Sequence, residues 1–270
     1  MPRYPTPQDE WRAYLDGTHW QIVWGRRLFG HIPWAPRCTV CLAPFAGPGG
    51  AGFRLVGIKR WEKNPNVCNH CIRALVKHDV MGADAEISFL FADVRHSSEL
   101  ARAMDTYAFA ELMQRFYRTA NDVLLDHSAI LDKFVGDEVV GFFMPFMTGP
   151  DHAGTALRAA DALLAATGHG EPDGPWLPVG AGVNSGVTFV GMVSRGSGSE
   201  FTAFGDAINL AAHLATQAGV GEILTTDATI DAAGLNVDDR GHRRLSLKGR
   251  QVDAVSLSVG SVPGGPSASR

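Results

Sequence analysis

The sequence predicts an α+β fold with a mostly antiparallel sheet and helices packed against one face. Two observations support this fold class. From about residue 86 onward, short β-branched and aromatic runs of strand length alternate with amphipathic helical segments. Some of these runs follow each other through a tight glycine turn, and such turns join antiparallel neighbours. This order of elements is typical of an α+β layout.

The expected elements can be given by their residue ranges. Hydrophobic residues at helical spacing predict a long helix over about 103–126. The other helices are expected at 151–167 and 206–218, with a short one after residue 225. The glycine-rich segment 194–200 is expected to be a mobile loop. Strands are expected at 87–92, 129–135, 138–144, 177–184, 186–194, 221–225, 241–247 and 251–259.

Length and charge limit the classes of function. The chain has 270 residues, a net charge of −4 and a pI of about 6.2. This balance argues against a broad nucleic-acid or anionic-membrane surface, although it allows a local basic site. No apolar run reaches the roughly 18 residues of a membrane span, and the N-terminus lacks an apolar signal core. The sequence therefore predicts a soluble, cytoplasmic protein.

The N-terminal third is expected to form two small units before the main domain. Residues 1–36 are rich in tryptophan and predict a helical segment, with one helix starting at Thr6-Pro7 and another over about 19–29. Residues 37–80 are expected to form a four-cysteine metal-binding module. The glycine-rich stretch between its cysteine pairs shows no helical period.

The four cysteines form two C-x-x-C pairs, Cys38 with Cys41 and Cys68 with Cys71. Two such pairs can supply a tetrahedral set of thiolates, which favours structural Zn²⁺. An iron–sulfur cluster, which also uses four thiolates, is the alternative. Free thiols or redox-active disulfides are a third possibility. His70 is interpreted as a surface residue rather than a ligand.

Two carboxylates are expected to converge at the edge of the sheet. Asp93 follows an apolar strand, and Asp137 follows Gly136 at the tip of a predicted hairpin. If the two strands are neighbours, both side chains point to the same place. With no arginine expected to neutralise them, two hard anions suit divalent metal ions and a phosphate substrate.

These motifs together resemble the catalytic domain of the class III adenylate/guanylate cyclases, over residues 86–259. The resemblance rests on FLFADVRHSS, KFVGDEVVGFF, VGAGVNSGVTFVG and FTAFGDAINLAAHLA. It implies a ferredoxin-like α+β domain, and residues 260–270 are expected to be a disordered tail. The four-cysteine module with RWEKNPNVC is similar to one found in front of some bacterial cyclases.

The resemblance implies that Asp93 and Asp137 bind two Mg²⁺ or Mn²⁺ ions, with the carbonyl of Val94 as a further ligand. The ions would assist attack of the ribose 3′-hydroxyl on the α-phosphate of ATP, giving 3′,5′-cyclic AMP and pyrophosphate. Lys133 and Thr202 match the positions that recognise the base, and this pair favours adenine over guanine. Expected products and cofactors are therefore those of an adenylate cyclase.

The remaining site positions follow from the same resemblance. Asn209 matches the residue that orients the ribose, and Lys248 matches a basic residue that contacts the triphosphate, with Arg250 as competitor. The family places an arginine four residues after the asparagine, but this chain has His213 there. Histidine lacks the guanidinium fork and is only partly charged near pH 7. The sequence thus predicts a slow enzyme or, alternatively, a catalytically silent nucleotide-binding regulator.

The family also implies composite sites in a homodimer. One subunit supplies the two aspartates, and the partner supplies Lys133, Thr202, Asn209 and His213. Because this chain carries both sets, it is expected to self-associate and to need no second gene product. Asp206 is interpreted as the N-cap of the helix that carries Asn209.

Overall fold

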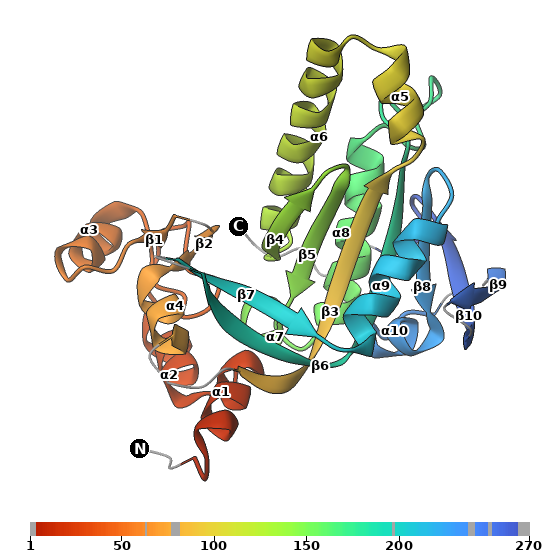
Figure 1. Ribbon diagram of the computed structural model, residues 1–270. Helices are drawn as coiled ribbons and strands as arrows, with labels where there is room; N and C mark the ends of the chain where they lie inside the picture. Colours follow the sequence, from red (N-terminus) through yellow and green to blue (C-terminus); the bar gives the residue numbers. More distant parts are fainter. Residues whose placement is uncertain are drawn as a thin grey trace.

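The computed structural model describes residues 4–62, 64–76, 82–195, 198–236, 241–247 and 250–263. It has two parts that share one core. An eight-stranded sheet with helices on both faces forms the larger part, and a small helical module with a two-stranded sheet lies at one end of it (Figure 1). The predicted α+β class with a mostly antiparallel sheet is confirmed.

The main sheet has the strand order β4-β5-β3-β6-β8-β10-β9, and β7 pairs with β6 outside this path. All pairs are antiparallel except the short parallel pair of β6 with β8. The strands are β3 (Gly82–Val94), β4 (Ile130–Val135), β5 (Glu138–Phe143), β6 (Val179–Arg195), β7 (Gly198–Phe204), β8 (Glu222–Thr226), β9 (Gly241–Leu247) and β10 (Arg250–Ser258).

Side chains of β3 alternate between two cores, as the period of a strand requires. Leu90 and Ala92 face the core made with α6 (Thr106–Asp126) and α8 (His152–Ala166). Phe89 and Phe91 face the opposite core, which includes α9 (Asp206–Gln217) and the N-terminal module. The sheet is therefore covered on both faces, not on one face as the sequence indicated. The remaining helices of this part are α5 (Ser97–Ala103), α7 (Pro145–Thr148) and α10 (Asp227–Ala232).

The two strands predicted at 177–184 and 186–194 are one continuous strand, β6, so this part of the prediction was wrong. β6 pairs with β3 without interruption from Val179 to Gly191. The expected break before Gly186 is absent, and a Cβ at Gly186 would meet the Cβ of Ala207 at 3.1 Å. Its role is close approach of helix α9 to the sheet. Strand β7 begins within the segment that was expected to be a loop, and residues 196 and 197 lie outside the described residues.

The N-terminal module contains α1 (Pro7–Leu15), α2 (Trp20–Phe29), α3 (Gly47–Leu55), β1 (Arg60–Trp61), β2 (Asn64–Cys68) and α4 (Asn69–Val76). The predicted start of α1 is confirmed: Thr6 and Asp9 form a capping box, with proline at the first helical position. Helix α3 was missed, because its sequence GPGGAGFRL is poor in helix formers. Packing of Phe53 against Phe29 of α2 supports it.

Hydrogen bonds join the module to the main sheet at several places. Within the module, Trp11 donates to the carbonyl of Leu75 at 3.0 Å, which fixes α1 on α4. Arg12 donates to the carbonyl of Asp84 in β3 at 3.0 Å. Asn64 donates to the carbonyl of Ala129, directly before β4. Because buried cysteines and buried sheet residues belong to the same apolar core, the two parts are packed as one unit.

No helix in the described part of the chain is long and apolar enough to cross a membrane. The hairpin predicted at Gly136 is confirmed, since β4 and β5 are antiparallel and Gly136 has a φ of +62°. The long predicted helix is also confirmed as α6, although it begins at Thr106 and follows the short α5. The last part of the expected tail, residues 264–270, lies outside the described residues.

Candidate functional site

The structure brings the predicted carboxylates Asp93 and Asp137 together. Strand β3 pairs with β5, and Asp93 lies opposite Glu138 in this register. The backbone N–H of Val94 donates to the carbonyl of Asp137 at 3.2 Å, which ties the end of β3 to the hairpin tip. The charge of Asp137 also contributes to raising the pKa of Asp93, after the larger effect of burial. Two anions held this closely are suited to a divalent cation.

An arginine neutralises part of this charge, contrary to the expectation from the sequence. The Arg95 guanidinium is ion-paired with the Asp93 carboxylate, and both side chains are largely buried. The pKa of Asp93 is nevertheless above its ordinary value, first because burial disfavours the charged form and further because Asp137 repels it. Arg95 acts in the opposite direction. The sequence contained the signal, since Arg95 is two residues after Asp93.

Arg95 also contacts the end of α9. Its Nη1 atom donates to the carbonyls of Thr216 at 3.1 Å and Ala218 at 3.3 Å. These carbonyls lie at the C-terminus of the helix, where the free carbonyl oxygens carry partial negative charge. One side chain thus links the predicted metal site to the helix that carries Asn209.

A cavity of about 590 Å³ lies beside the hairpin tip. Its walls come from α5, α6 and the β4–β5 turn: Ser97, Ser98, Ala101, Thr106, Phe109, Ala110, Met113, Gln114, Tyr117, Gly136 and Asp137. The hydroxyl of Tyr117 donates to the carbonyl of Gly136 and so holds the turn. Burial, and then the charge of Asp137, raise the pKa of Tyr117. The sequence assigned Tyr117 only to the apolar face of the helix.

Helix α9 carries two predicted site residues on its surface. Asn209 is exposed and His213 is half-buried. The N-cap is Gly205 rather than Asp206, which is the first helical residue, so the predicted cap was wrong. Gly205 has a φ of +157°, and a Cβ there would lie 2.6 Å from the hydroxyl oxygen of Thr188. This close approach requires glycine.

The base-recognition positions lie on two strands. Thr202 is half-buried on β7, opposite Gly191 of β6. Lys133 lies on β4 opposite Val140, but its side chain is outside the described residues, and so is all of Lys248. The described residues that line the cavity beside Asp137 do not include Thr202, Asn209 or His213. A single chain therefore does not gather all predicted positions around this cavity.

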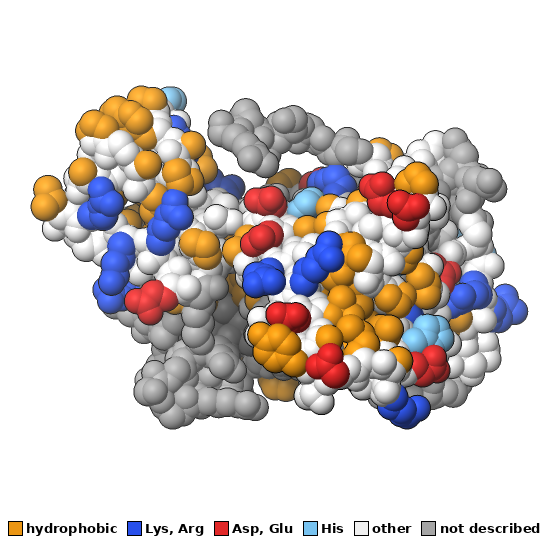
Figure 2. All heavy atoms as spheres, turned by 90° about the horizontal axis from the view of Figure 1, so that it is seen from above, with side chains coloured by type: hydrophobic (Ala, Val, Ile, Leu, Met, Phe, Trp, Pro, Cys, Tyr) orange, Lys and Arg blue, Asp and Glu red, His pale blue; other side chains and the backbone are white. Residues whose placement is uncertain are grey.

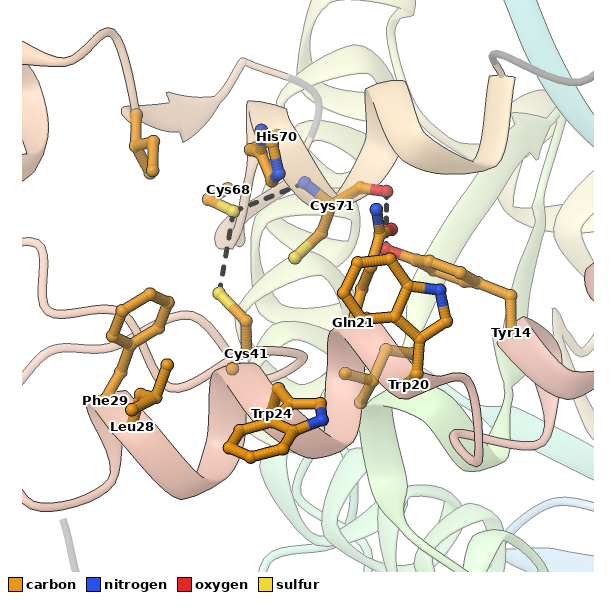
Figure 3. A pocket seen from close by; sticks show the side chains of 13 residues that line it. Tyr14, Trp20, Gln21, Trp24, Leu28, Phe29, Cys41, Cys68, His70 and Cys71 are labelled. Carbon is orange, nitrogen blue, oxygen red and sulfur yellow. Dashed lines mark hydrogen bonds between the residues drawn. The ribbon is translucent and has the colours of Figure 1, made fainter. Parts of the chain in front are cut away.

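The four cysteines form a buried cluster in the module. All four Sγ atoms lie within 4.8 Å of one another and none forms a disulfide. Two of the sulfur pairs are close. The Sγ atoms of Cys41 and Cys68 are 3.8 Å apart (Figure 3), and those of Cys38 and Cys71 are 4.0 Å apart. Ligands about 2.3 Å from a tetrahedral zinc ion lie about 3.8 Å apart. The sulfur atoms thus fit a single metal ion.

Backbone donors surround the sulfur atoms, as in the metal sites formed by C-x-x-C turns. The N–H of Cys68 donates to Sγ of Cys38 at 3.3 Å, and the N–H of Cys71 donates to Sγ of Cys68 at 3.4 Å. The pKa of the Cys71 thiol is raised, and the largest cause is the side-chain hydrogen bond between its sulfur atom and that of Cys38. Four thiols this close cannot all ionise unless a cation lies among them. His70 is exposed and is not part of the group.

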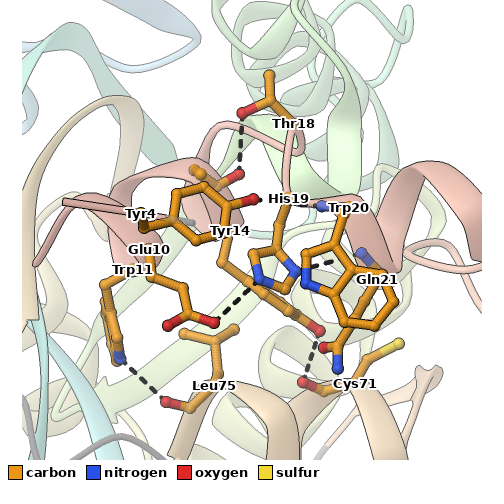
Figure 4. A network of polar contacts seen from close by, with 11 residues as sticks. Tyr4, Glu10, Trp11, Tyr14, Thr18, His19, Trp20, Gln21, Cys71 and Leu75 are labelled. Atoms are coloured by element: carbon orange, nitrogen blue, oxygen red, sulfur yellow. Dashed lines mark hydrogen bonds and ion pairs between the residues drawn. The ribbon is translucent and has the colours of Figure 1, made fainter. Parts of the chain in front are cut away.

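Aromatic residues of α1 and α2 lie beside the Cys71 end of the cluster (Figure 4). The hydroxyl of Tyr14 donates to the carbonyl of Cys71 at 2.8 Å. Behind Tyr14, the buried His19 contacts Glu10 at 3.3 Å and accepts from the N–H of Gln21. A cavity of about 250 Å³, lined mainly by apolar side chains, reaches three of the cysteines (Figure 3).

Comparison with known proteins gives one family. The model of the adenylate and guanylate cyclase catalytic domain matches residues 80–257. A terminal-differentiation-specific adenylate cyclase of Dictyostelium discoideum is 27% identical over 179 residues, which cover 63% of this chain and 8% of that protein. The adenylate cyclase of Anabaena cylindrica is 23% identical over 137 residues, 47% of this chain and 26% of that protein. The chain thus spans less than a third of the length of these relatives.

Solved structures of both nucleotide classes have a similar fold. The guanylyl cyclase Cya2 has a TM-score of 0.61 and 22% identity, with 70% of this chain and 98% of that chain covered. The adenylyl cyclase CyaB from P. aeruginosa has a TM-score of 0.56 and 23% identity, with 68% and 100% covered. At these identities the likeness shows the fold and not the choice of nucleotide.

Proposed function

Because the chain belongs to the family of adenylate and guanylate cyclase catalytic domains, we propose that it converts ATP to 3′,5′-cyclic AMP and pyrophosphate. The observation that carries this proposal is the pair Asp93 and Asp137, held together at the rim of a cavity of about 590 Å³. Class III cyclases use divalent metal ions, and these carboxylates suit such ions.

In the proposed reaction, Asp93, Asp137 and the carbonyl of Val94 hold two Mg²⁺ or Mn²⁺ ions. The ions would lower the pKa of the ribose 3′-hydroxyl and balance the charge on the departing pyrophosphate. Arg95 opposes the rise in the pKa of Asp93 that burial causes, and its ion pair orients the carboxylate. The fit is supported by the electrostatic repulsion between the aspartates, which a bound cation relieves.

We assign recognition of the substrate to the residues that match the family motifs. Lys133 and Thr202 would recognise adenine through a donor to a ring nitrogen and a hydroxyl partner for the exocyclic amine. Asn209 would orient the ribose, and Lys248 would contact the triphosphate. The exposed position of Asn209 on α9 leaves its amide accessible to a ligand.

The proposed enzyme is a homodimer with shared sites. The cavity beside Asp137 lacks Thr202, Asn209 and His213 among its described lining residues, so a second copy would supply them. The proposed catalytic domain comprises residues 86–259, after the helical segment 1–36 and the module 37–80. A cytoplasmic location fits this reading.

A second candidate function rests on His213. A weak or silent nucleotide-binding regulator would result if the absence of the arginine at this position abolished turnover. Loss of one transition-state charge contact costs on the order of 10²–10³ in rate. Retention of both aspartates favours a slow enzyme over a silent one.

For the cysteine module we propose one structural Zn²⁺ ion that supports or regulates the cyclase. The sulfur distances of 3.8 and 4.0 Å support a single ion. An iron–sulfur cluster remains the alternative, and its visible absorption would distinguish it from colourless zinc.

The test uses the full-length protein purified without oxygen. Metal content is measured first, and the same sample is then incubated separately with ATP, GTP, CTP and UTP in the presence of Mn²⁺. Cyclic AMP as the main product, absent in Asp137→Asn, supports the proposal. Cyclic GMP as the main product would overturn the choice of substrate, and no cyclic product with any nucleotide would favour the silent regulator.

A further inference from the structure

The module exposes an unusual set of apolar side chains on α2, α3 and the segments that follow them. Val23, Trp24, Leu28, Trp34, Leu55 and Val56 are between 43% and 89% exposed. Leu55 and Val56 have the highest values of the six, at 89% and 73%. Helices α2 and α3 touch through Phe29 and Phe53, whose rings are 4.8 Å apart. We call these six residues and the cations described next the module face.

The module face is basic although the whole chain is acidic. Residues 17–61 contain six arginines and lysines and no aspartate or glutamate, whereas the chain has a net charge of −4. Arg27, Arg54, Lys59 and Arg60 are exposed. Within the part of the chain that the structure describes, none of these four forms an ion pair with a carboxylate. Their charge is available to an external anion.

The shape of this surface indicates the kind of partner. Helix α3 lies at the far end of the module, away from the main sheet (Figure 1). Hydrophobic side chains gather at this end of the molecule with Lys and Arg side chains beside them (Figure 2). A Cβ added at Gly52 or Gly57, on either side of Leu55 and Val56, would meet no atom within 4 Å. The apolar tip projects into open space.

We propose that the module face docks on the surface of an anionic lipid bilayer. A projecting apolar tip needs a soft partner that closes around it, and the lipid headgroup region meets this need. Tryptophan and arginine side chains suit the boundary between water and lipid, because they combine an apolar body with a polar end. Each lysine or arginine near an anionic bilayer contributes about 1 kcal/mol.

An acidic protein and a second copy of the chain are less suitable occupants. An acidic protein would need a hollow that matches the tip, and a second copy would place the same cations opposite each other. An anionic lipid surface can adapt its shape to the projecting tip, and it presents negative charge to the cations. Docking would place the proposed cyclase beside the bilayer.

The test is co-sedimentation of the protein with lipid vesicles. One set of vesicles contains phosphatidylcholine alone, and the other contains about 30% of the anionic lipid phosphatidylglycerol. Binding to the anionic vesicles only, and a steep loss of binding at high salt, is the expected result. Leu55→Ser with Val56→Ser should reduce the partition coefficient at least about tenfold. Arg54→Gln with Lys59→Gln should reduce it about fivefold for each charge.

Two matched controls lie on the main domain. Val220→Ser removes an apolar side chain that is 50% exposed, and Arg118→Gln removes an exposed cation. Both should bind vesicles as the unaltered protein does, and none of the variants should change the melting temperature. Equal binding to neutral vesicles, or no binding, would overturn the proposal. A third result would also overturn it: the unaltered protein does not bind vesicles, and the Leu55/Val56 variant changes its oligomeric state. That result would assign the module face to contact with a second copy of the chain.

Discussion

The guanidinium group of Arg95 is ion-paired with the carboxylate of Asp93 and at the same time bound to carbonyls at the end of α9. The side chain therefore joins the end of a central strand to the helix that carries Asn209 and His213. Burial raises the pKa of Asp93, whereas Arg95 lowers it. The ionisation of Asp93 depends on this contact.

We expect Arg95→Gln to move the acid limb of the pH–rate profile to higher pH. Burial and Asp137 still raise the pKa of Asp93 in this variant, and the opposing effect of the guanidinium is lost. The measurement is the rate of cyclisation at saturating Mn²⁺ across the pH range. Arg95→Lys keeps the charge and should restore most of the acid limb. An unchanged acid limb in Arg95→Gln would show that Asp93 does not control it.

Asp93→Asn should stabilise the metal-free protein while abolishing its activity. The folded-state pKa of Asp93 is raised, so the stability contributed by the protonated carboxyl is full at low pH and lost as pH rises through that pKa. At pH 7 the neutral amide removes this loss, so the melting temperature of the metal-free variant should be higher than that of the unaltered protein. The gain should vanish near pH 3. Mn²⁺ should stabilise the unaltered protein more than the variant.

Mixing two inactive variants should restore activity if the sites are shared. Asp93→Ala lacks the metal ligand and Asn209→Ala lacks the ribose contact, but a mixed dimer has one site with both residues intact. At equal concentrations the mixture should reach about one quarter of the normal rate, since half of the dimers are mixed and each has one working site. The control is Asp93→Ala mixed with Asp137→Ala, which should stay inactive. Lack of rescue after subunit exchange would contradict the composite site.

His213→Arg should increase the turnover number by about 10²-fold at neutral pH. The half-buried histidine lies one helical turn after Asn209, and arginine at this place would carry a permanent charge with a planar fork of donors. The measurement is kcat from pH 6 to 9, with His213→Gln as the neutral control. A histidine that works only when protonated should lose rate as pH rises, and the arginine variant should not. Equal rates for all three forms would show that this position does not limit turnover.

Cys68→Ser should remove the metal ion from the module and lower the melting temperature of the whole protein. Cys68 is fully buried and belongs to the core shared with the main sheet, so loss of the ion weakens both parts. Metal analysis and calorimetry provide the measurements. His70→Ala is the matched control, because His70 is adjacent to Cys71 but exposed and outside the sulfur cluster. Its metal content should stay near one ion per chain.

Sequence reasoning predicted the features whose causes are local. The helix start at Thr6-Pro7, the turn at Gly136 and the apolar stripe of α6 depend on neighbours within a few residues, and all three are confirmed. The proximity of Asp93 to Asp137 was also predicted. It follows from strand pairing between a strand end and a hairpin tip.

The features that sequence reasoning missed depend on distant contacts. The single strand β6 was predicted as two strands, 177–184 and 186–194, whereas it pairs with β3 without a break and Gly186 admits helix α9. Helix α3 is stabilised by Phe29 from another helix rather than by its own residues. The contact of Arg95 with the end of α9 joins residues more than 120 positions apart.

Strand β3 connects the N-terminal module with the carboxylate pair. It begins at Gly82 and ends at Val94, directly after Asp93. Near its beginning, Arg12 of α1 donates a hydrogen bond to the carbonyl of Asp84. Thirteen residues of extended chain span about 40 Å, and β6 pairs with β3 along this entire length. The module and the carboxylate pair are therefore connected through one strand that is paired with its neighbour without a break.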